Sequence, residues 1–361
     1  MSYKKIFFSF LFIVLLGVIS ISFFIFFTKA YKSEVLIDSQ IYQKNHHSAL
    51  SDRITKFHIL KKKKNLEYVI MGTSSTWVFD PKLIEKKYNF KGAINISQAA
   101  AKIVEHYKFI LWILENKRDV KEIIINLEPF SFNELQYSRL PYEIEITLKD
   151  KIANFFSFLS LKDAVKIFLV DLNFLSKNKP EIKKGIGDSY FYSGLRYYPD
   201  YFKRLNNNEL TIKMVNKLKN SNIKYYRESF DKNSLNYLRE ILKKSRDRNI
   251  KVTLFFDPVS YIFLQSNDYE YLYSELKIIK KIVNELNQEV FYFNNLNEIN
   301  YALNLFEDGH SHYNYDAAKL VLEEILQDNL VIGTKISKDN FDSILNEIIE
   351  KTKSKKINAL Y

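Results

Sequence analysis

Residues 68–75 read YVIMGTSS, an apolar run that ends in a glycine and three hydroxyl side chains. The run predicts a strand over residues 67–71 that is buried on both faces, as the strands of parallel sheets are. Gly72 permits a sharp exit from this strand and a close approach of neighbouring backbone. The segment therefore predicts a hydroxyl-bearing turn, centred on Ser74, at the carboxyl end of an early strand.

Strands and helices alternate outward from this segment. Further strands are expected at 93–96, 121–127, 250–256 and 289–293, the last of the sheet, and helices at 81–88, 99–116, 234–248, 269–286 and 315–327. Asp80 is the expected cap of the first helix, and Pro81 occupies its first position. This order predicts an α/β fold with a central, mainly parallel sheet and helices on both faces.

The stretch 130–230 interrupts this alternation. It is rich in Tyr, Phe and Asn and carries turn signals at 185–188 and 198–200. We interpret it as an insertion of helices and loops packed over the strand ends. Its aromatic side chains are explained either by the burial of an irregular lid or by a platform that binds glycan.

Residues 6–27 form an apolar run whose only glycine is Gly17. A helix of this length rises roughly 33 Å, enough to cross the hydrocarbon core of a bilayer. The alternative is a cleaved secretory signal, but no small-residue cleavage site follows the run. The expected organisation is a tail and transmembrane anchor (1–29), a juxtamembrane stalk (30–64), an α/β domain (65–335) and a C-terminal helix and tail (336–361).

The charge around the apolar run does not decide its orientation, because lysines stand on both sides of it. The very short N-terminal tail is expected to stay inside, which places the remainder in the periplasm of a bacterium, anchored in the cytoplasmic membrane. The chain has no cysteine, which fits that compartment. Its net charge of +12 would then face anionic surface glycans or lipid headgroups rather than nucleic acid. The lysine run 61–64 is interpreted as a solvated lead-in to the first strand.

Residues 308–315 read DGHSHYNY and precede the last predicted helix of the alternation. Ligands bind at the carboxyl ends of the strands in sheets of this kind. The turn at 72–74, Glu128, Asp257 and the loop at 308–312 are all expected at those ends. The histidines at positions 46, 47, 58 and 106 lie in the stalk, before the first strand or within a helix, where a structural or exposed role is expected.

A serine hydroxyl becomes a nucleophile when a neighbouring base takes its proton and a carboxylate orients that base. Ser74, His312 and Asp308 supply these three groups, with His310 as an alternative base. Two other interpretations stay open. The 72–75 turn is also explained as a simple helix cap, and Asp308, His310 and His312 are also explained as ligands of a metal-dependent hydrolase. The leading hypothesis involves no metal and no cofactor.

These segments resemble the SGNH (GDSL-like) hydrolase and acyltransferase superfamily, specifically its membrane-anchored cell-envelope branch. Gly72-Thr73-Ser74 is similar to the family's Gly-Asp-Ser block, with threonine in place of aspartate. The segment from Asp308 to His312 is similar to its Asp-x-x-His block, with one extra residue. The resemblance covers about residues 65–330 and implies a flavodoxin-like, three-layer α/β/α fold and a Ser-His-Asp triad.

The chain departs from the family in the second and third blocks. Residues 95–98 read NISQ and lack the glycine whose N–H joins the oxyanion hole, although a backbone N–H at Gln98 would serve. Residues 125–129 read INLEP and lack the family's asparagine donor, while Glu128 stands at the equivalent strand end. The resemblance therefore implies oxyanion or substrate contacts near Gly72, Ser75, Gln98 and Glu128.

Two functions of different classes follow. The first is a membrane-anchored serine esterase or O-acyltransferase that acts on acyl groups, O-acetyl groups foremost, of a surface glycan. An acyl donor or an envelope-assembly protein would be its partner. The second is a catalytically inactive descendant that binds glycan or scaffolds an envelope assembly, an alternative suggested by the missing glycine and asparagine.

Overall fold

The structure is a computed structural model of the chain. It describes residues 3–27, 52–133, 144–145, 148–149, 152, 161, 165, 231–266, 269–306 and 311–358. The expected insertion at 130–230 lies almost entirely outside these residues. The chain forms two compact units, one made of Met1–Lys62 and Tyr137–Gly187, the other of Lys63–Gln136 and Asp188–Tyr361.

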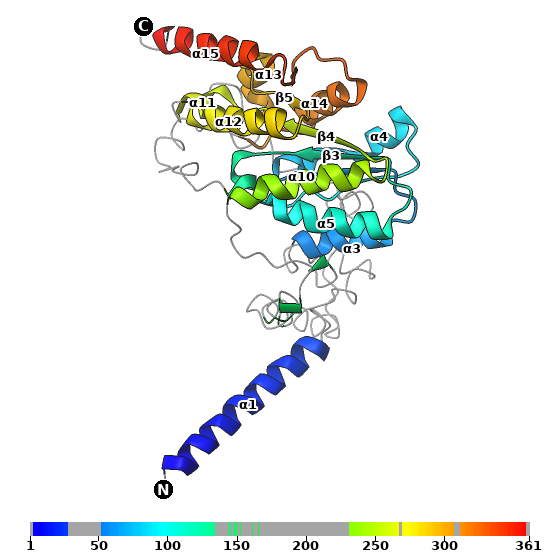
Figure 1. Cartoon of the computed structure of the whole chain (residues 1–361), viewed down its shortest axis with the longest axis vertical. Helices are drawn as coiled ribbons and strands as arrows, with labels where there is room; N and C mark the ends of the chain where they lie inside the picture. The colour runs from blue at the N-terminus through cyan, green and yellow to red at the C-terminus, as the bar shows by residue number, and fades with distance from the viewer. Residues whose placement is uncertain are drawn as a thin grey trace, which may run out of the picture. The chain divides into compact units, whose positions relative to one another are not determined.

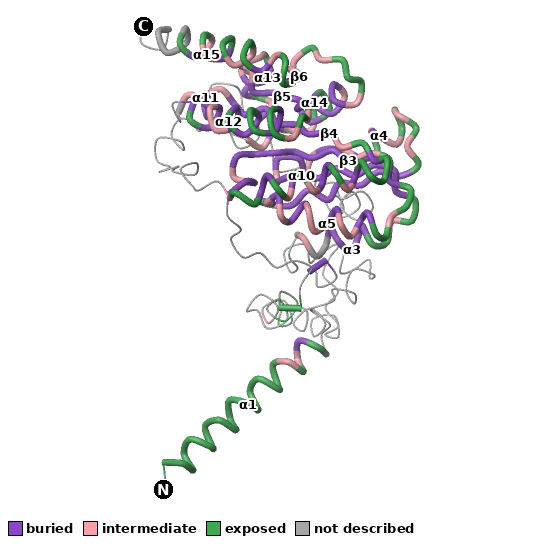
Figure 2. The backbone as a smooth tube through the Cα atoms, in the orientation of Figure 1, coloured by how far each residue is buried: buried purple, intermediate pink, exposed green. Residues whose placement is uncertain are grey.

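The first unit contains two described helices, α1 (Tyr3–Phe27) and α3 (Asp52–Lys62). The apolar helix expected at 6–27 is therefore present. By length and composition, its segment Tyr3–Phe26 can cross a membrane. Figure 2 shows α1 exposed over most of its length, with Ile25 near its end buried.

The second unit is built on one six-stranded sheet with the order β2-β1-β3-β4-β5-β6 (Figure 1). Its strands are β1 (Tyr68–Met71), β2 (Ala93–Asn95), β3 (Glu122–Asn126), β4 (Lys251–Phe256), β5 (Val290–Tyr292) and β6 (Thr334–Ile336). The first five strands pair in parallel, as the sequence predicts, and each lies within an expected range. Every residue of β1, β2 and β5 is buried, as the continuous apolar runs require.

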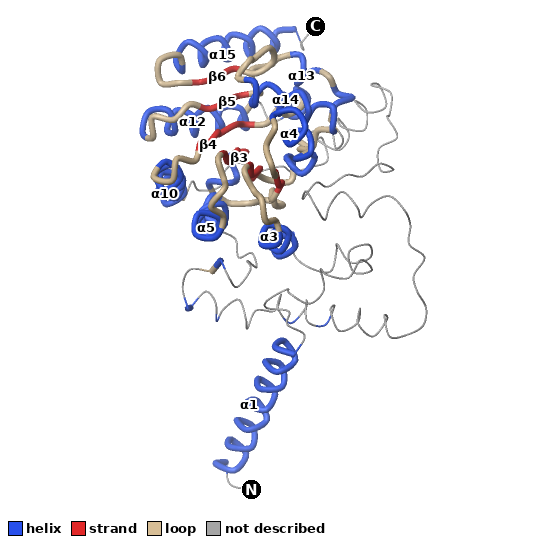
Figure 3. The backbone as a smooth tube through the Cα atoms, turned by 90° about the vertical axis from the view of Figure 1, so that its right-hand side faces the viewer, coloured by secondary structure: helices blue, strands red, loops and turns tan. Residues whose placement is uncertain are grey.

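Helices connect these strands. The described ones are α4 (Pro81–Tyr88), α5 (Ile103–Asn116), α10 (Lys232–Arg246), α11 (Tyr261–Ser266), α12 (Glu270–Glu285), α13 (Glu298–Tyr301), α14 (Tyr315–Gln327) and α15 (Phe341–Asn358). Figure 3 shows α5, α10 and α12 on one side of the sheet and α4 and α14 on the other. Short 3-10 helices follow two strands, η1 (Ser75–Val78) after β1 and η2 (Pro129–Phe132) after β3.

The start of α4 is fixed as its sequence predicts. The Asp80 carboxylate accepts a hydrogen bond from the Lys82 backbone N–H at 2.9 Å, and Pro81 occupies the first helical position. The helix ends at Asn89, whose φ of 57° is left-handed.

The helix expected at 99–116 begins later than predicted, at Ile103. Ala100 has a left-handed φ of 50°, and Lys102 is extended, so the chain makes a turn before the helix starts. The Glu105 carboxylate closes that turn by accepting the Lys102 backbone N–H at 2.8 Å. Composition alone suggested the earlier start, because residues 99–101 are alanines with high helix propensity.

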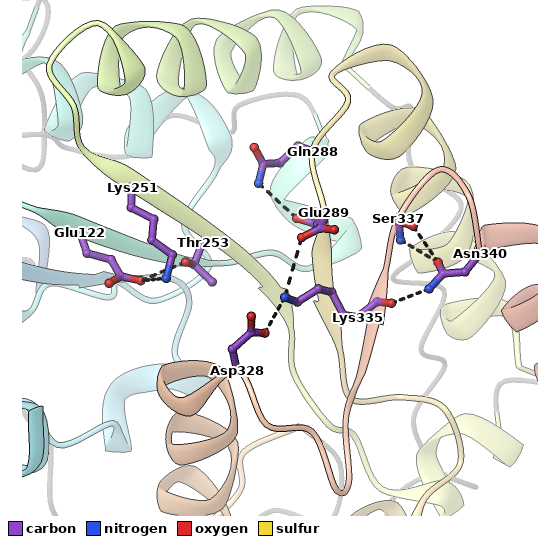
Figure 4. Close-up of polar contacts among 9 residues, drawn as sticks. All are labelled: Glu122, Lys251, Thr253, Gln288, Glu289, Asp328, Lys335, Ser337 and Asn340. Carbon is purple, nitrogen blue, oxygen red and sulfur yellow. Dashed lines mark hydrogen bonds and ion pairs between the residues drawn. The ribbon is translucent and has the colours of Figure 1, made fainter.

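The expectation that residues 289–293 form the last strand is wrong. β6 follows and pairs antiparallel with β5. Figure 4 shows how polar contacts hold it: the Lys335 ammonium lies 2.5 Å from Asp328 and 3.8 Å from Glu289, and Asn340 donates to the Lys335 carbonyl at 2.9 Å. β6 is three residues long and only Ile336 is buried, so it lacks the apolar run that identifies the other strands.

A hollow of about 600 Å³ lies at the amino ends of β4 and β5. Its lining includes Arg246, Lys251, Gln288 and Lys335, the last three of which Figure 4 labels. Ser74 lies at the carboxyl end of β1, and the strands are parallel. The hollow and Ser74 therefore belong to opposite ends of the sheet.

Candidate active site

Ser74 lies in the turn between β1 and η1, where it precedes the first residue of the 3-10 helix. Its backbone is right-handed, with φ −66° and ψ −24°. The side chain is half-buried, whereas those of Thr73 and Ser75 are buried. Of three consecutive hydroxyls, the middle one alone is therefore partly open to the surface.

The structure brings Ser74 and His312 together. Ser74 Oγ lies 2.8 Å from His312 Nε2, although 238 positions separate the two residues in the chain. This is the distance of a good hydrogen bond. An imidazole at this position can take the proton of the hydroxyl as the oxygen attacks an electrophile.

His312 is held in place by the residues that follow it. The Asn314 side chain caps α14 by accepting the Ala317 backbone N–H at 3.1 Å, and the Asn314 backbone N–H donates to the Leu305 carbonyl at 2.7 Å. The Tyr313 ring is fully buried, with its centroid 6.0 Å from that of Phe79. Because Phe79 follows directly after η1, this packing joins the histidine loop to the serine turn.

Asp308 and His310 lie outside the described residues. The orientation of His312 by Asp308, the alternative base at His310 and the metal site at Asp308, His310 and His312 stay predictions. Within the described ranges, His, Cys, Asp and Glu side chains form no group of three or more arranged to hold a metal ion.

A buried carboxylate lies behind the serine turn. Thr73 and Ser75 both donate hydrogen bonds to Glu128 Oε1, the second at 3.0 Å, and their own oxygens are 2.9 Å apart. Glu128 comes two residues after β3, so the ends of two neighbouring strands are joined here. The Ser75 and Glu128 side chains bond each other inside the protein, and the substrate or oxyanion contacts expected near them stay predictions.

Thr73, Ser75 and Glu128 begin a row of polar side chains along the strand ends, which we call the polar row. A second buried carboxyl group, that of Asp257, continues it at the end of the next strand. Asn126, the last residue of β3, donates to Asp257 Oδ1, and Asp257 directly follows β4. Thr73 also lies 3.4 Å from Asn126 Oδ1. Burial, reinforced by the charge of Glu128, raises the pKa of the Asp257 carboxyl group well above its ordinary value, although the hydroxyls of Ser75 and Tyr313 oppose the rise.

The hydroxyl of Tyr313 faces the same carboxyl group. Neither Tyr313 Oη nor Asp257 Oδ2 makes a hydrogen bond of good geometry, and both atoms are buried. Burial and then the charges of Asp257 and Glu128 raise the pKa of the Tyr313 hydroxyl well above its ordinary value. Tyr313 therefore stays a neutral phenol beside the carboxyl pair.

The polar row extends further to β5 and α12. Asn294 donates to the Asp257 carbonyl at 2.6 Å and to the two Glu275 carboxylate oxygens at 3.0 and 2.9 Å. Tyr292 also donates to Glu275, at 3.3 Å. Burial raises the pKa of Glu275 well above its ordinary value, while the bonds from Asn294 and Tyr292 oppose the rise. Polar groups therefore line the carboxyl ends of four adjacent strands.

Gly72 is required by close packing rather than by an unusual backbone angle. A Cβ atom at this position would lie 2.6 Å from Asn126 Cβ and 2.5 Å from Thr76 Oγ1. Real Cβ atoms do not approach other atoms so closely, and Asn126 is fully buried. The glycine thus lets the serine turn lie directly against the end of β3, as the sequence suggests.

The backbone N–H of Gln98, a predicted oxyanion donor, has a partner inside the protein. This N–H donates to the Gly72 carbonyl at 2.9 Å and is therefore already engaged. The Gln98 side chain is buried, and neither atom of its amide has a hydrogen-bond partner. Gln98 thus fixes the path of the turn before Ser74 through its backbone, and its N–H would have to leave Gly72 before it could bind an oxyanion.

Sequence reasoning missed the network formed by Thr73, Asn126 and Tyr313 with the two carboxyl groups. One signal was present in the sequence: Asn126 and Asp257 are polar residues that terminate strongly apolar strands. Their mutual contacts depend on the strand order, which brings β3 beside both β1 and β4.

No protein-family model matches this chain, and no curated protein matches it either. The contacts of Ser74 and its neighbours are therefore the principal observations that bear on its chemistry.

Proposed function

We propose that the chain is a membrane-anchored serine esterase or O-acyltransferase of SGNH type, with the family's three-layer α/β/α domain. Its substrates would be acyl groups, O-acetyl groups foremost, on a cell-surface glycan. The observation that carries the proposal is the 2.8 Å contact between Ser74 Oγ and His312 Nε2 at the carboxyl ends of the strands.

In the proposed reaction, Ser74 Oγ attacks the acyl carbonyl carbon while His312 Nε2 takes the hydroxyl proton. The tetrahedral intermediate then collapses to an acyl-serine, and the protonated imidazole gives its proton to the departing alkoxide. Water or a sugar hydroxyl next attacks the acyl-serine, with the imidazole again acting as base. Asp308 would orient the imidazole, and the Ser74 backbone N–H would donate to the oxyanion.

The proposed location is the cytoplasmic membrane of a bacterium, with α1 as a single-pass anchor and the α/β unit in the periplasm. Support comes from the length and apolar composition of α1. Within such an envelope the substrate would be an anionic glycan, since the chain carries a net charge of +12.

The test uses the full chain in detergent with 4-nitrophenyl acetate as substrate. We expect Ser74→Ala to lower kcat/KM by roughly 10³-fold or more, because both steps pass through the serine oxygen. Ser274→Ala is the matched control: this serine lies on α12 and bonds the Glu270 carbonyl of its own helix. Equal turnover by wild type and Ser74→Ala would remove Ser74 from the mechanism.

A second candidate is a catalytically inactive protein that binds glycan or scaffolds an envelope assembly. The observation that favours it is the engaged N–H of Gln98, since an oxyanion would have one donor fewer than the family's pattern supplies. A serine-reactive fluorophosphonate separates the two candidates. Covalent labelling of wild type but not of Ser74→Ala supports the enzyme, whereas glycan binding by a chain that resists labelling supports the second candidate.

A further inference from the structure

The two residues that flank Ser74 share one acceptor. Thr73 and Ser75 point inward and donate to the same oxygen of Glu128, while the side chain between them is directed to the surface. A rotation of the turn that moved Ser74 inward would pull both flanking hydroxyls off this carboxylate. The position of Ser74 Oγ is therefore coupled to contacts that the serine itself does not make.

The residue that follows His312 is buried beside the same groups, and its ring packs near Phe79. Tyr313 is fully buried, and its hydroxyl faces Asp257, the neighbour of Glu128 in the polar row. Asn126 links the two carboxyl groups, since it donates to Asp257 and its own carbonyl oxygen lies 3.4 Å from Thr73. Residues adjacent to both members of the Ser74–His312 pair thus lie in or beside one buried cluster.

This cluster is stiff for a physical reason. Thr73, Ser75, Asn126, Glu128 and Asp257 each expose less than a tenth of their surface. A buried hydroxyl or carboxyl group that loses its partner is destabilised, since water cannot replace the bond. Each alternative orientation of the serine turn would leave several such groups unpaired.

We propose that Glu128 is a positioning residue that holds Ser74 at hydrogen-bonding distance from His312, through its bonds from Thr73 and Ser75. This inference rests on the proposed function of the Ser74–His312 pair. The Glu128 carboxylate does not touch the substrate; it acts through the backbone turn that carries Ser74.

The test measures kcat and KM for 4-nitrophenyl acetate with the full chain in detergent. Thr73→Val removes a hydroxyl with little change of shape. Ser75→Ala removes the second hydroxyl, and Glu128→Gln replaces the carboxylate that accepts both bonds with an amide. Each is expected to lower kcat by roughly 10- to 100-fold, because a displacement of about 1 Å at the nucleophile has that effect. KM should change by less than about threefold, since substrate contacts are unaffected.

Two further variants separate positioning from a general loss of structure. Thr73→Ser keeps the hydroxyl and should retain wild-type kcat within about threefold. Glu122→Gln is the matched control for Glu128→Gln: it makes the same chemical change on β3, but at the amino end, where Glu122 pairs with Lys251 at 3.0 Å. Its kcat should equal that of wild type.

The double variant Thr73→Val/Glu128→Gln tests whether the members act as one unit. Its loss in kcat should equal that of the worse single variant rather than the product of the two. Should Glu128→Gln fail to fold, the comparison of Thr73→Val with Thr73→Ser decides the question. Equal kcat for these two variants overturns the positioning role.

The outcomes distinguish this proposal from the proposed function. A wild-type chain that neither turns over the ester nor reacts with a fluorophosphonate overturns both. An active wild type whose Thr73→Val and Ser75→Ala variants keep full kcat overturns the positioning role alone. An active wild type with a selective fall of kcat in Thr73→Val, restored in Thr73→Ser, supports it.

Discussion

Burial gives different environments to three hydroxyls that are consecutive in the sequence. Thr73 and Ser75 donate hydrogen bonds to Glu128 inside the protein, whereas the half-buried Ser74 lies at hydrogen-bonding distance from the His312 imidazole. The chemistry available to each oxygen follows from its partner: a carboxylate acceptor fixes a hydroxyl, whereas a neutral imidazole can remove its proton. The residue type alone would not distinguish them.

The buried carboxyl group of Glu275 should make the free energy of unfolding depend on pH. This group is fully buried, and burial raises its pKa in the folded protein. In the unfolded chain it ionises near the ordinary value of about 4.3. The folded state therefore keeps a proton that the unfolded state loses. The contribution of Glu275 to the free energy of unfolding is thus fully present below about pH 4.3 and is lost as the pH rises toward the folded pKa.

The variant Glu275→Gln remains neutral at every pH and should escape this loss. Its free energy of unfolding relative to wild type is expected to rise with pH above about 4.3, by up to about 1.4 kcal/mol per pH unit. Urea unfolding of both chains between pH 4 and pH 7 measures the difference. Curves that stay parallel over this range would contradict the prediction.

The candidate site was predictable from sequence only in part. Ser74 and His312 stand next to turn signals at the ends of regular elements, so a strand-by-strand analysis places both at one edge of the sheet. The contacts of Glu128 with Thr73 and Ser75 were not predictable in detail, because they depend on the register between β1 and β3. The bond from the Gln98 N–H was not predictable for the same reason: its acceptor, the Gly72 carbonyl, is recognisable only once β1 and β2 are paired.

At the scale of the element, α4 offers a direct measurement of a helix cap. Asp80→Ala removes the acceptor of the Lys82 N–H and should lower the free energy of unfolding by about 1 kcal/mol. Asp80 also accepts from the Tyr315 hydroxyl at 3.3 Å, so Tyr315→Phe is the matched control. Urea unfolding measures both variants. A fall in the free energy of unfolding that is as large for Tyr315→Phe as for Asp80→Ala would contradict a capping role.

Whole elements were predicted most securely where the sequence pattern is strong. The five parallel strands are apolar runs bounded by polar residues, and α14 has the predicted bounds because Asn314 caps a regular amphipathic pattern. β6 escaped prediction because polar side-chain contacts hold it, and the turn before α5 because its residues are alanines with high helix propensity. An ion pair and side-chain amide bonds hold β6, and a left-handed alanine delays α5. Propensity therefore predicts neither.

For the molecule as a whole, α1 is a segment whose length and apolar composition allow it to cross a membrane. Deleting residues 1–28 should move the protein from the membrane fraction to the soluble fraction, because burial of an apolar helix of this length in lipid is strongly favourable. Immunoblotting after alkaline carbonate extraction measures the distribution. The control variant Leu15→Ala/Leu16→Ala keeps the helix apolar and should stay in the membrane. A deleted chain that also stays there would contradict the role of α1.

The long sequence interval between Ser74 and His312 has a consequence during synthesis. Because His312 comes 238 positions after Ser74, a nascent chain carries the hydroxyl long before its imidazole partner is translated. Chains that end before His312 thus lack the pair, and reactivity at Ser74 would report that synthesis has passed His312 and that the two residues have come together.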